Sequence, residues 1–310
     1  MGVDLERMLE RCERGQWSVE DFDWTTRPIA LTPDQETQLC AYYVNMSYIE
    51  RLAGALFRSL AERQGDPTLR AIFTTFAVDE LRHSHAAARL ADYFDVHHFR
   101  IYTPNLAMLR FMPYFVGMID GMSPAFATSF ILGGELILDI ALLRSLNAWV
   151  DDPLSRAVVE RINQDESRHI AMDMHMTEHF ARAAAMEALP AASPWSDRDF
   201  WGVLAWGPGF FTDVFFRPMQ VLDPSQAYMR EVMHRFRRFY DRAAVDGNPA
   251  VEQFRSIAGL LETPAGAVVG QALETAIHWL SGIDIAFVRA GSSSARGGAS
   301  TDPLTVSALA

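Results

Sequence analysis

Two five-residue stretches, Asp79-Glu80-Leu81-Arg82-His83 and Asp165-Glu166-Ser167-Arg168-His169, share the pattern Asp-Glu-x-Arg-His. Each lies in a long segment whose apolar residues repeat with helical spacing. On a helix, a Glu and a His three residues apart lie on one face, one turn apart, so both can bind the same metal ion. A single Glu-x-x-His match can arise by chance, whereas the duplicated five-residue form indicates two halves of one metal site.

The spacing of acidic residues around two predicted turns supplies a carboxylate partner for each stretch. The first turn lies midway between Glu50 and Glu80, which are 30 residues apart, and the second lies midway between Glu135 and Glu166, which are 31 apart. At a helical rise of about 1.5 Å per residue, all four carboxylates are about 22 Å from their turns and therefore at equal height. The two helical pairs form an internal repeat.

The neighbours of these acids differ. Glu135 stands in the apolar run 130–138, where a carboxylate without a partner would be costly to bury and where a metal cation would offset that cost. The assignment of Glu50 as a ligand depends on its distance from the turn alone, since an exposed Glu that pairs with its neighbour Arg51 would explain the residue equally well. Glu36 is a poor substitute because it falls near a helix start.

The whole chain is predicted to be all-α, because no strand pattern competes with the helical spacing. The predicted helices cover about 32–64, 67–94, 123–150, 153–186, 197–221, 224–244 and 264–289, with an irregular crossover at 97–123. The predicted organisation is an N-terminal extension at 1–31, a helical domain at 32–290 with its metal-binding core at about 33–186 and accessory helices at about 197–290, and a disordered tail at 291–310.

Composition narrows the function further. The chain has 310 residues and a formal charge of −12, which argues against a nucleic-acid partner. All 27 cationic side chains are Arg, which excludes lysine Schiff-base chemistry. The two cysteines, Cys12 and Cys40, give no disulfide framework or zinc spacing, and the charged first residues do not resemble a signal peptide, so we expect a cytoplasmic protein. The most apolar run, 123–150, is interrupted by charges and is expected to be a buried helix that does not span a membrane.

On these residues, the chain resembles the ferritin-like di-iron carboxylate superfamily. The Asp-Glu-x-Arg-His form is most similar to its oxygen-activating branch of hydroxylases, desaturases and N-oxygenases. The resemblance covers about 33–186 and implies a ferritin-like four-helix bundle core with additional C-terminal helices. It implies that one iron is bound by Glu50, Glu80 and His83 and the other by Glu135, Glu166 and His169. It also implies that Asp79 contacts His169, that Asp165 contacts His83, and that Arg82 and Arg168 pair with these aspartates.

The resemblance implies a di-iron enzyme that uses dioxygen to oxidise a small organic substrate by hydroxylation, N-oxygenation, desaturation or oxidative cleavage. A ferredoxin or reductase would supply electrons, and the C-terminal helices would wall a pocket or form a homodimer interface. Two alternatives stay open: a Mn/Fe ligand-binding oxidase with a bound fatty acid, and a non-catalytic ferritin-like structural protein.

Three positions separate members of this branch. Asp139, four residues after Glu135, is our candidate catalytic residue: it would be a proton relay, an additional iron ligand or a partner of Arg144. Ala87 stands where ribonucleotide reductase small subunits carry a radical Tyr. Ile162 stands where arylamine N-oxygenases carry a third His. The last two departures argue against both of those chemistries.

Overall fold

The computed structural model describes residues 3–182, 185, 196–225 and 227–262. Within these residues every regular element is helical and no strand is present, so the all-α prediction is confirmed. The predicted helix at 264–289 and the predicted tail at 291–310 lie outside the described residues.

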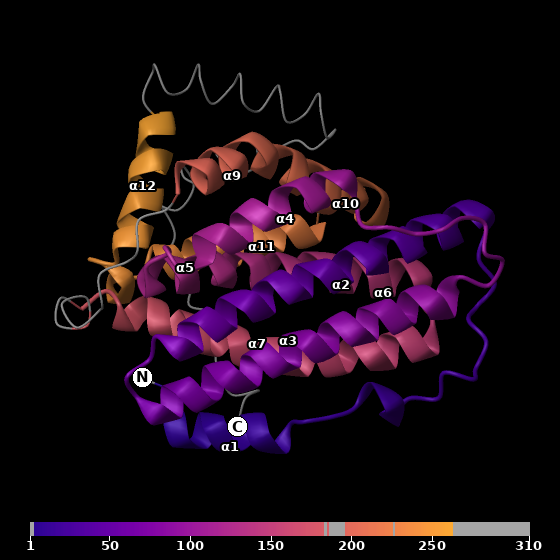
Figure 1. Cartoon of the computed structure of the whole chain (residues 1–310), viewed down its shortest axis with the longest axis horizontal. Coiled ribbons are helices and arrows are strands. Elements are labelled where there is room, and N and C mark those ends of the chain that lie inside the picture. Colours follow the sequence, from indigo (N-terminus) through magenta and orange to yellow (C-terminus); the bar gives the residue numbers. More distant parts are fainter. Residues whose placement is uncertain (1–2, 183–184, 186–195, 226, 263–310) are drawn as a thin grey trace, which may run out of the picture.

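Four long helical runs lie side by side at the centre of the molecule (Figure 1). They are α2 (Pro33–Glu62), α3 (Pro67–Phe94), α7 (Pro153–His179) and a composite run of α5 (Pro124–Leu136), the π-helix η2 (Ile137–Leu143) and α6 (Arg144–Val150). The most extensive packing is between α2 and α3, and α5 packs against α7. Contacts of α3 with α7 and of α2 with α5 join the two pairs.

All four runs begin in the same way, with a capping side chain followed by proline at the first helical position. The capping side chains accept hydrogen bonds from free backbone N–H groups of the first turn. Proline is tolerated at the first position because a backbone N–H there would have no hydrogen-bond acceptor within the helix. The four starts are Thr32-Pro33, Asp66-Pro67, Ser123-Pro124 and Asp152-Pro153. As a consequence Glu80 and Glu166 each lie 13 residues after the initial proline of their helix.

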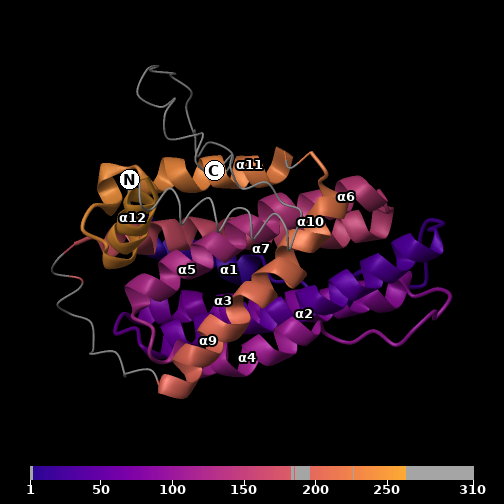
Figure 2. The same ribbon diagram turned by 90° about the horizontal axis from the view of Figure 1, so that it is seen from above.

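Shorter helices cover the central runs on two sides (Figures 1 and 2). On one side, α1 (Leu5–Arg14) contacts α3 and α7. The remaining elements are α4 (Leu106–Ile119), α9 (Asp197–Phe210), the π-helix η3 (Phe211–Phe216), α10 (Arg217–Leu222), α11 (Ala227–Tyr240), α12 (Pro249–Glu262) and two short 3-10 helices, η1 (Val19–Asp21) and η4 (Ala243–Val245). Among these, α4 packs on α9 and α11 packs on η2.

Several element boundaries differ from the sequence prediction. The expected irregular crossover contains α4, which accommodates Pro113 inside it, and α12 was not predicted at all. The helix predicted at about 197–221 corresponds to the continuous run of α9, η3 and α10, which accommodates Pro208 inside α9. α7 ends at His179, several residues before the predicted end.

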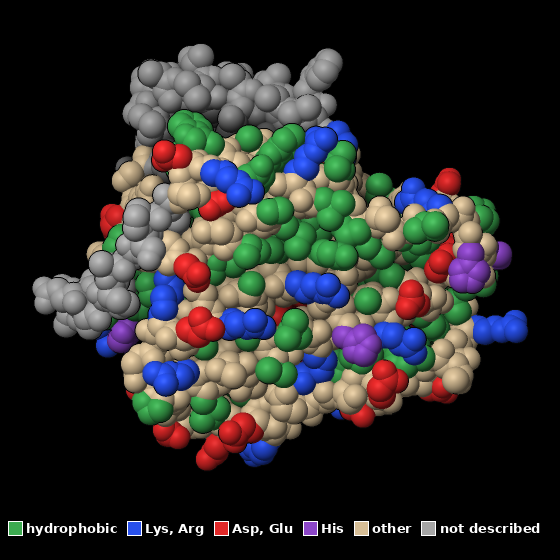
Figure 3. Space-filling view, in the orientation of Figure 1, with side chains coloured by type: hydrophobic (Ala, Val, Ile, Leu, Met, Phe, Trp, Pro, Cys, Tyr) green, Lys and Arg blue, Asp and Glu red, His purple; other side chains and the backbone are tan. Residues whose placement is uncertain are grey.

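One described helical run, Pro124–Val150, is long and apolar enough to cross a membrane by length and composition alone. About 69% of its most apolar window is buried inside the protein, where it packs on α7 and α11. Such burial is typical of a core helix. Among the described residues, Phe130 is the one large apolar side chain exposed in this run, whereas α4 and α9 carry three each (Figure 3).

Candidate metal centre

The structure brings together all six acidic and histidine residues that were predicted to bind metal. They form two buried groups, and within each group one ligand atom per residue lies within 4.8 Å of the others. The groups are Glu50, Glu80, His83 and Glu166, and Glu80, Glu135, Glu166 and His169. Glu80 and Glu166 belong to both groups, so their carboxylates lie between the two positions that an ion could occupy.

Both imidazole rings turn the same nitrogen toward the centre of this cluster. The Nδ1 atom of His83 is 3.0 Å from Glu166 Oε1, and that of His169 is 3.1 Å from Glu80 Oε1 and 3.2 Å from Glu166 Oε2. A metal-binding His uses one ring nitrogen for the ion and the other for a supporting hydrogen bond. The rings therefore have the orientation that metal binding through Nδ1 requires.

The opposite ring nitrogens contact the two aspartates across the helical pairs. His83 Nε2 lies 3.0 Å from Asp165 Oδ2, and His169 Nε2 lies 3.4 Å from Asp79 Oδ2. Both contacts were implied by the family resemblance, and both are present. A carboxylate at Nε2 favours the tautomer that carries its proton there, which leaves the Nδ1 lone pair directed at the cluster.

Two arginines neutralise the buried aspartates. Arg82 pairs with Asp79 and Arg168 pairs with Asp165, each three residues along its own helix. Each guanidinium also lies 3.6 Å from the aspartate of the other helix. The four side chains form a charge-balanced network behind the histidines, which offsets the cost of burying the two carboxylates.

The N-terminal extension supports this network through contacts that were not predicted. Trp17 Nε1 donates a hydrogen bond to Asp165 Oδ2 at 2.8 Å, and Gln16 Nε2 donates to Asp79 Oδ1 at 3.0 Å. The Trp17 ring also stacks near His83, with ring centroids 6.4 Å apart. These contacts join residues 63 and 148 positions apart, so no local sequence pattern predicts them.

A close helix approach brings Glu80 against α2. Gly54 lies one turn after Glu50, and a Cβ atom built on it would be 3.1 Å from the Cβ of Glu80. That separation is tighter than ordinary van der Waals contact, so only glycine fits here without displacing Glu80.

The cluster contains buried polar atoms without hydrogen-bond partners among the described residues. They are both carboxylate oxygens of Glu50, Glu80 and Glu166, Oε2 of Glu135, and Nδ1 of His83 and His169. A buried polar atom without a partner is costly, and so many around one point are rare in a folded core. A pair of divalent cations would satisfy them together, so the residues fit a two-metal centre.

The pKa values show how strongly these groups act on one another. Burial raises the pKa of Glu50 to about 7, and burial followed by repulsion from Glu166 raises those of Glu80 and Glu135 well above the ordinary value. Burial alone would raise the pKa of Glu166 too, but the adjacent carboxyl group of Glu135 and the charge of His169 lower it well below that value. Such perturbed groups concentrate at functional sites.

The two histidines hold protons more strongly than ordinary imidazoles. Burial alone would lower the pKa of His83, but the hydrogen bond to Asp165 and the Glu166 carboxylate 3.0 Å from Nδ1 raise it to about 10. Burial opposes the shift of His169 as well, while the charge of Glu166 and the hydrogen bond to Asp79 raise its pKa to about 9. Protons on both rings thus take the place that cations would fill.

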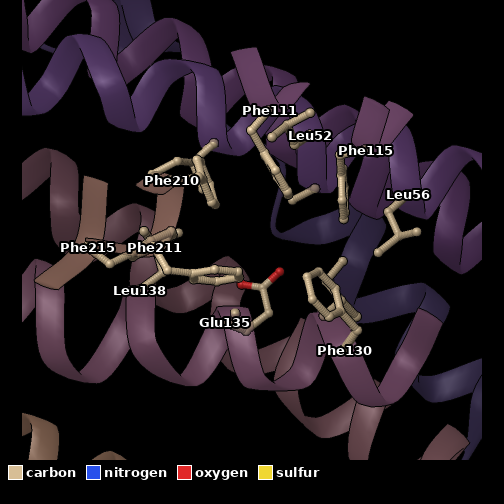
Figure 4. Close-up of a pocket in the computed structure, with 14 residues that line it drawn as sticks. Leu52, Leu56, Phe111, Phe115, Phe130, Glu135, Leu138, Phe210, Phe211 and Phe215 are labelled. Atoms are coloured by element: carbon tan, nitrogen blue, oxygen red, sulfur yellow. The ribbon is translucent and has the colours of Figure 1, made fainter. Parts of the chain in front are cut away.

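An apolar cavity of about 90 Å³ adjoins the cluster at Glu135. Its wall contains six phenylalanines from α4, α5, α9 and η3: Phe111, Phe115, Phe130, Phe210, Phe211 and Phe215. In Figure 4 the carboxylate of Glu135 points from α5 into the space among these rings. Among the residues whose side chains the structure describes, Glu135 is the one charged residue that lines this cavity, and it is also a member of the metal cluster.

Two further acids bear on the site. Asp139 lies in the π-helix η2, and its side chain is outside the described residues; because η2 begins two residues after Glu135, the α-helical spacing assumed for Asp139 does not apply unchanged. Asp173, which the sequence argument missed, lies one turn after His169 and is buried with neither oxygen hydrogen-bonded to a described residue. Burial raises the pKa of Asp173 well above its ordinary value.

Comparison of the chain with known protein families and with curated proteins finds no match. The metal site is therefore inferred from the residues and their geometry.

Proposed function

We propose that the protein is a di-iron oxidase or oxygenase with a ferritin-like core, which uses dioxygen to oxidise a small organic substrate. The observation that carries this proposal is the pair of buried groups that share Glu80 and Glu166 beside an apolar cavity. Di-metal carboxylate centres are built in helix bundles from two Glu-x-x-His faces and one Glu from each of two other helices. The position of the six residues on α2, α3, α5 and α7 supports the proposal.

The donor set favours iron or manganese. Each group offers three carboxylates and one imidazole, a set typical of the harder divalent metals. Structural zinc sites are usually closed by four nitrogen or sulfur ligands, and no thiol belongs to either group. A Mn/Fe pair fits the same donors, and metal analysis would separate the two.

In this proposal each residue has a defined task. Glu50 with His83, and Glu135 with His169, would each hold one ion, while Glu80 and Glu166 would bridge them. When bound, the two ions would supply electrons for the reduction of dioxygen, and a ferredoxin or reductase would replace those electrons. The aspartate–arginine network would keep both imidazoles in the tautomer that binds metal.

The cavity determines what can reach this centre. An engineered apolar cavity of about 150 Å³ binds benzene, so a cavity of about 90 Å³ admits a smaller molecule or the apolar end of a larger one. A polar group placed among six phenylalanines would lose its hydrogen bonds to water without gaining others. The substrate should therefore present a C–H bond to the cluster, which favours hydroxylation or desaturation over N-oxygenation.

Oxygen uptake tests the proposal directly. Protein loaded anaerobically with Fe(II) should consume dioxygen when mixed with it, and Glu135→Gln should reduce the rate at least tenfold. Glu36→Gln is the matched control. Glu36, in α2, is buried like Glu135, but it forms hydrogen bonds with His97, away from the cluster. Absence of uptake in the loaded protein, or equal uptake in the Glu135→Gln variant, would contradict the proposal.

A further inference from the structure

A second cavity, of about 290 Å³, lies among α2, α6, η3, α10 and the segment that leads into α4. It is larger than the phenylalanine-lined cavity, and it has a different wall. Aliphatic side chains and the rings of Tyr42 and Trp149 form one part, and amide and charged side chains form the other. The metal cluster contributes no residue to it, so it is a separate site.

The polar part of this wall is rich in hydrogen-bond donors. Asn45 accepts a hydrogen bond from the backbone N–H of Asn105 through Oδ1, which leaves its NH₂ group without a partner among the described residues. Gln38, on the same side of α2, likewise has no side-chain hydrogen bond there. The amide groups therefore present donors toward the cavity.

The charges that line the cavity do not cancel. Arg217 pairs with Asp213 at 2.9 Å, whereas Arg100 has no carboxylate within ion-pair distance in the described part of the chain. Arg100 makes one long hydrogen bond, 3.5 Å to the Thr37 carbonyl, and lies over the Tyr102 ring. Since a guanidinium has five N–H donors, most of those of Arg100 are available to a ligand. One positive charge is left uncompensated at the rim.

We propose that this second cavity binds an organic carboxylate that carries one or two rings. The carboxylate would accept hydrogen bonds from Arg100 and the amide of Asn45, and the rings would pack on Trp149, Tyr42 and the aliphatic wall. The volume fits this class, because an apolar cavity of about 150 Å³ already holds one benzene ring. The proposal does not rest on the metal centre, because no residue of the cluster lines this cavity. Along α2 the nearest residue of the cavity wall to the cluster is Asn45, which lies five residues before Glu50 and so about 7.5 Å along the helix.

Calorimetric titration with 2-naphthoate tests this site, using the full-length chain as purified and again after treatment with a chelator. We expect saturable binding of one molecule per chain with equal affinity in both preparations. The neutral analogue 2-naphthamide should bind at least fivefold more weakly, because it cannot form the charge-assisted bonds. Affinity that disappears after chelation would mean that the carboxylate binds a metal instead, and it would overturn the proposal.

Three variants locate the binding. Asn45→Asp keeps the acceptor that Asn105 requires but replaces the donor with a negative charge, so the dissociation constant should rise more than tenfold. Arg100→Gln should raise it about threefold to fivefold, since this arginine is exposed. Arg110→Gln removes the same charge from an arginine that lies over Trp206, outside the cavity wall, and should leave the affinity unchanged. Absence of saturable binding, or equal affinity in all variants, would refute the proposal.

Discussion

The substitution Glu50→Gln gives the sharpest test of how the buried carboxylates are held. Glu50 is fully buried, and its pKa rises from 4.5 to about 7. Between these pH values the unfolded chain has lost this proton while the folded chain keeps it, so stability is fully present below pH 4.5 and falls as the pH rises toward 7. At about 1.4 kcal/mol per pKa unit, this one group accounts for a loss of about 3 kcal/mol.

The assay is urea unfolding at pH 5 and pH 8 in the presence of a chelator. Glutamine keeps the shape of the side chain but cannot ionise, so the variant should lose about 2.5 kcal/mol less than the parent between the two pH values, because a small part of the effect is already present at pH 5. Glu80 and Glu135 would still titrate in the variant, so part of the pH dependence should stay. If the parent and the variant had the same pH dependence, Glu50 could not be the buried and electrostatically strained group described above.

Three other predictions follow from individual contacts. Trp17→Phe should lower the free energy of unfolding by about 1.5–3 kcal/mol, because the lost indole hydrogen bond is made to a carboxylate. The control Trp24→Phe loses a hydrogen bond to a backbone carbonyl and should lower it by about 1 kcal/mol. Equal losses in the two variants would contradict the prediction. Gly54→Ala should cost about 1–3 kcal/mol and weaken metal binding. Gly134→Ala, whose Cβ would meet nothing within 4 Å, should instead stabilise by about 0.5–1 kcal/mol, and a destabilisation by both variants to the same extent would refute the packing argument. Filling both metal positions near pH 6 should release up to five protons, from two imidazoles and three carboxyl groups, and metal binding should become tighter as the pH rises. Calorimetry in buffers of different ionisation enthalpy counts the released protons. If no protons were released, these groups would not be metal ligands.

Local signals explain which parts of the fold could be predicted. The cap-and-proline starts of the four long runs lie within a few residues in the sequence, and the predicted start of α3 at Pro67 matches the structure. The assignment of Glu50 and Glu135 as ligands followed from their distance to the turns. Two helices joined by a short turn run antiparallel, so residues at equal distances from the turn lie side by side. The structure places both carboxylates in the cluster.

Other features depend on contacts that no local pattern contains. The hydrogen bond from Trp17 to Asp165 joins residues 148 positions apart, so no local sequence pattern could predict that the N-terminal extension contacts the cluster. The segment that forms α4 carries Pro113 and few polar residues, so it lacks the two-faced pattern by which a helix is recognised. The π-helix η2 differs from an α-helix by one residue in the spacing of its backbone hydrogen bonds, and its apolar sequence has no feature that distinguishes the two.

The central claim is that the chain holds two metal ions through two carboxylate-bridged positions. Metal analysis after anaerobic loading with Fe(II) and removal of excess metal tests it most directly. We predict two ions per chain in the parent protein, one in Glu135→Ala, and two in the control variant Glu36→Gln. A parent protein that retains no iron or manganese, or a Glu135→Ala variant that still retains two ions, would contradict the claim.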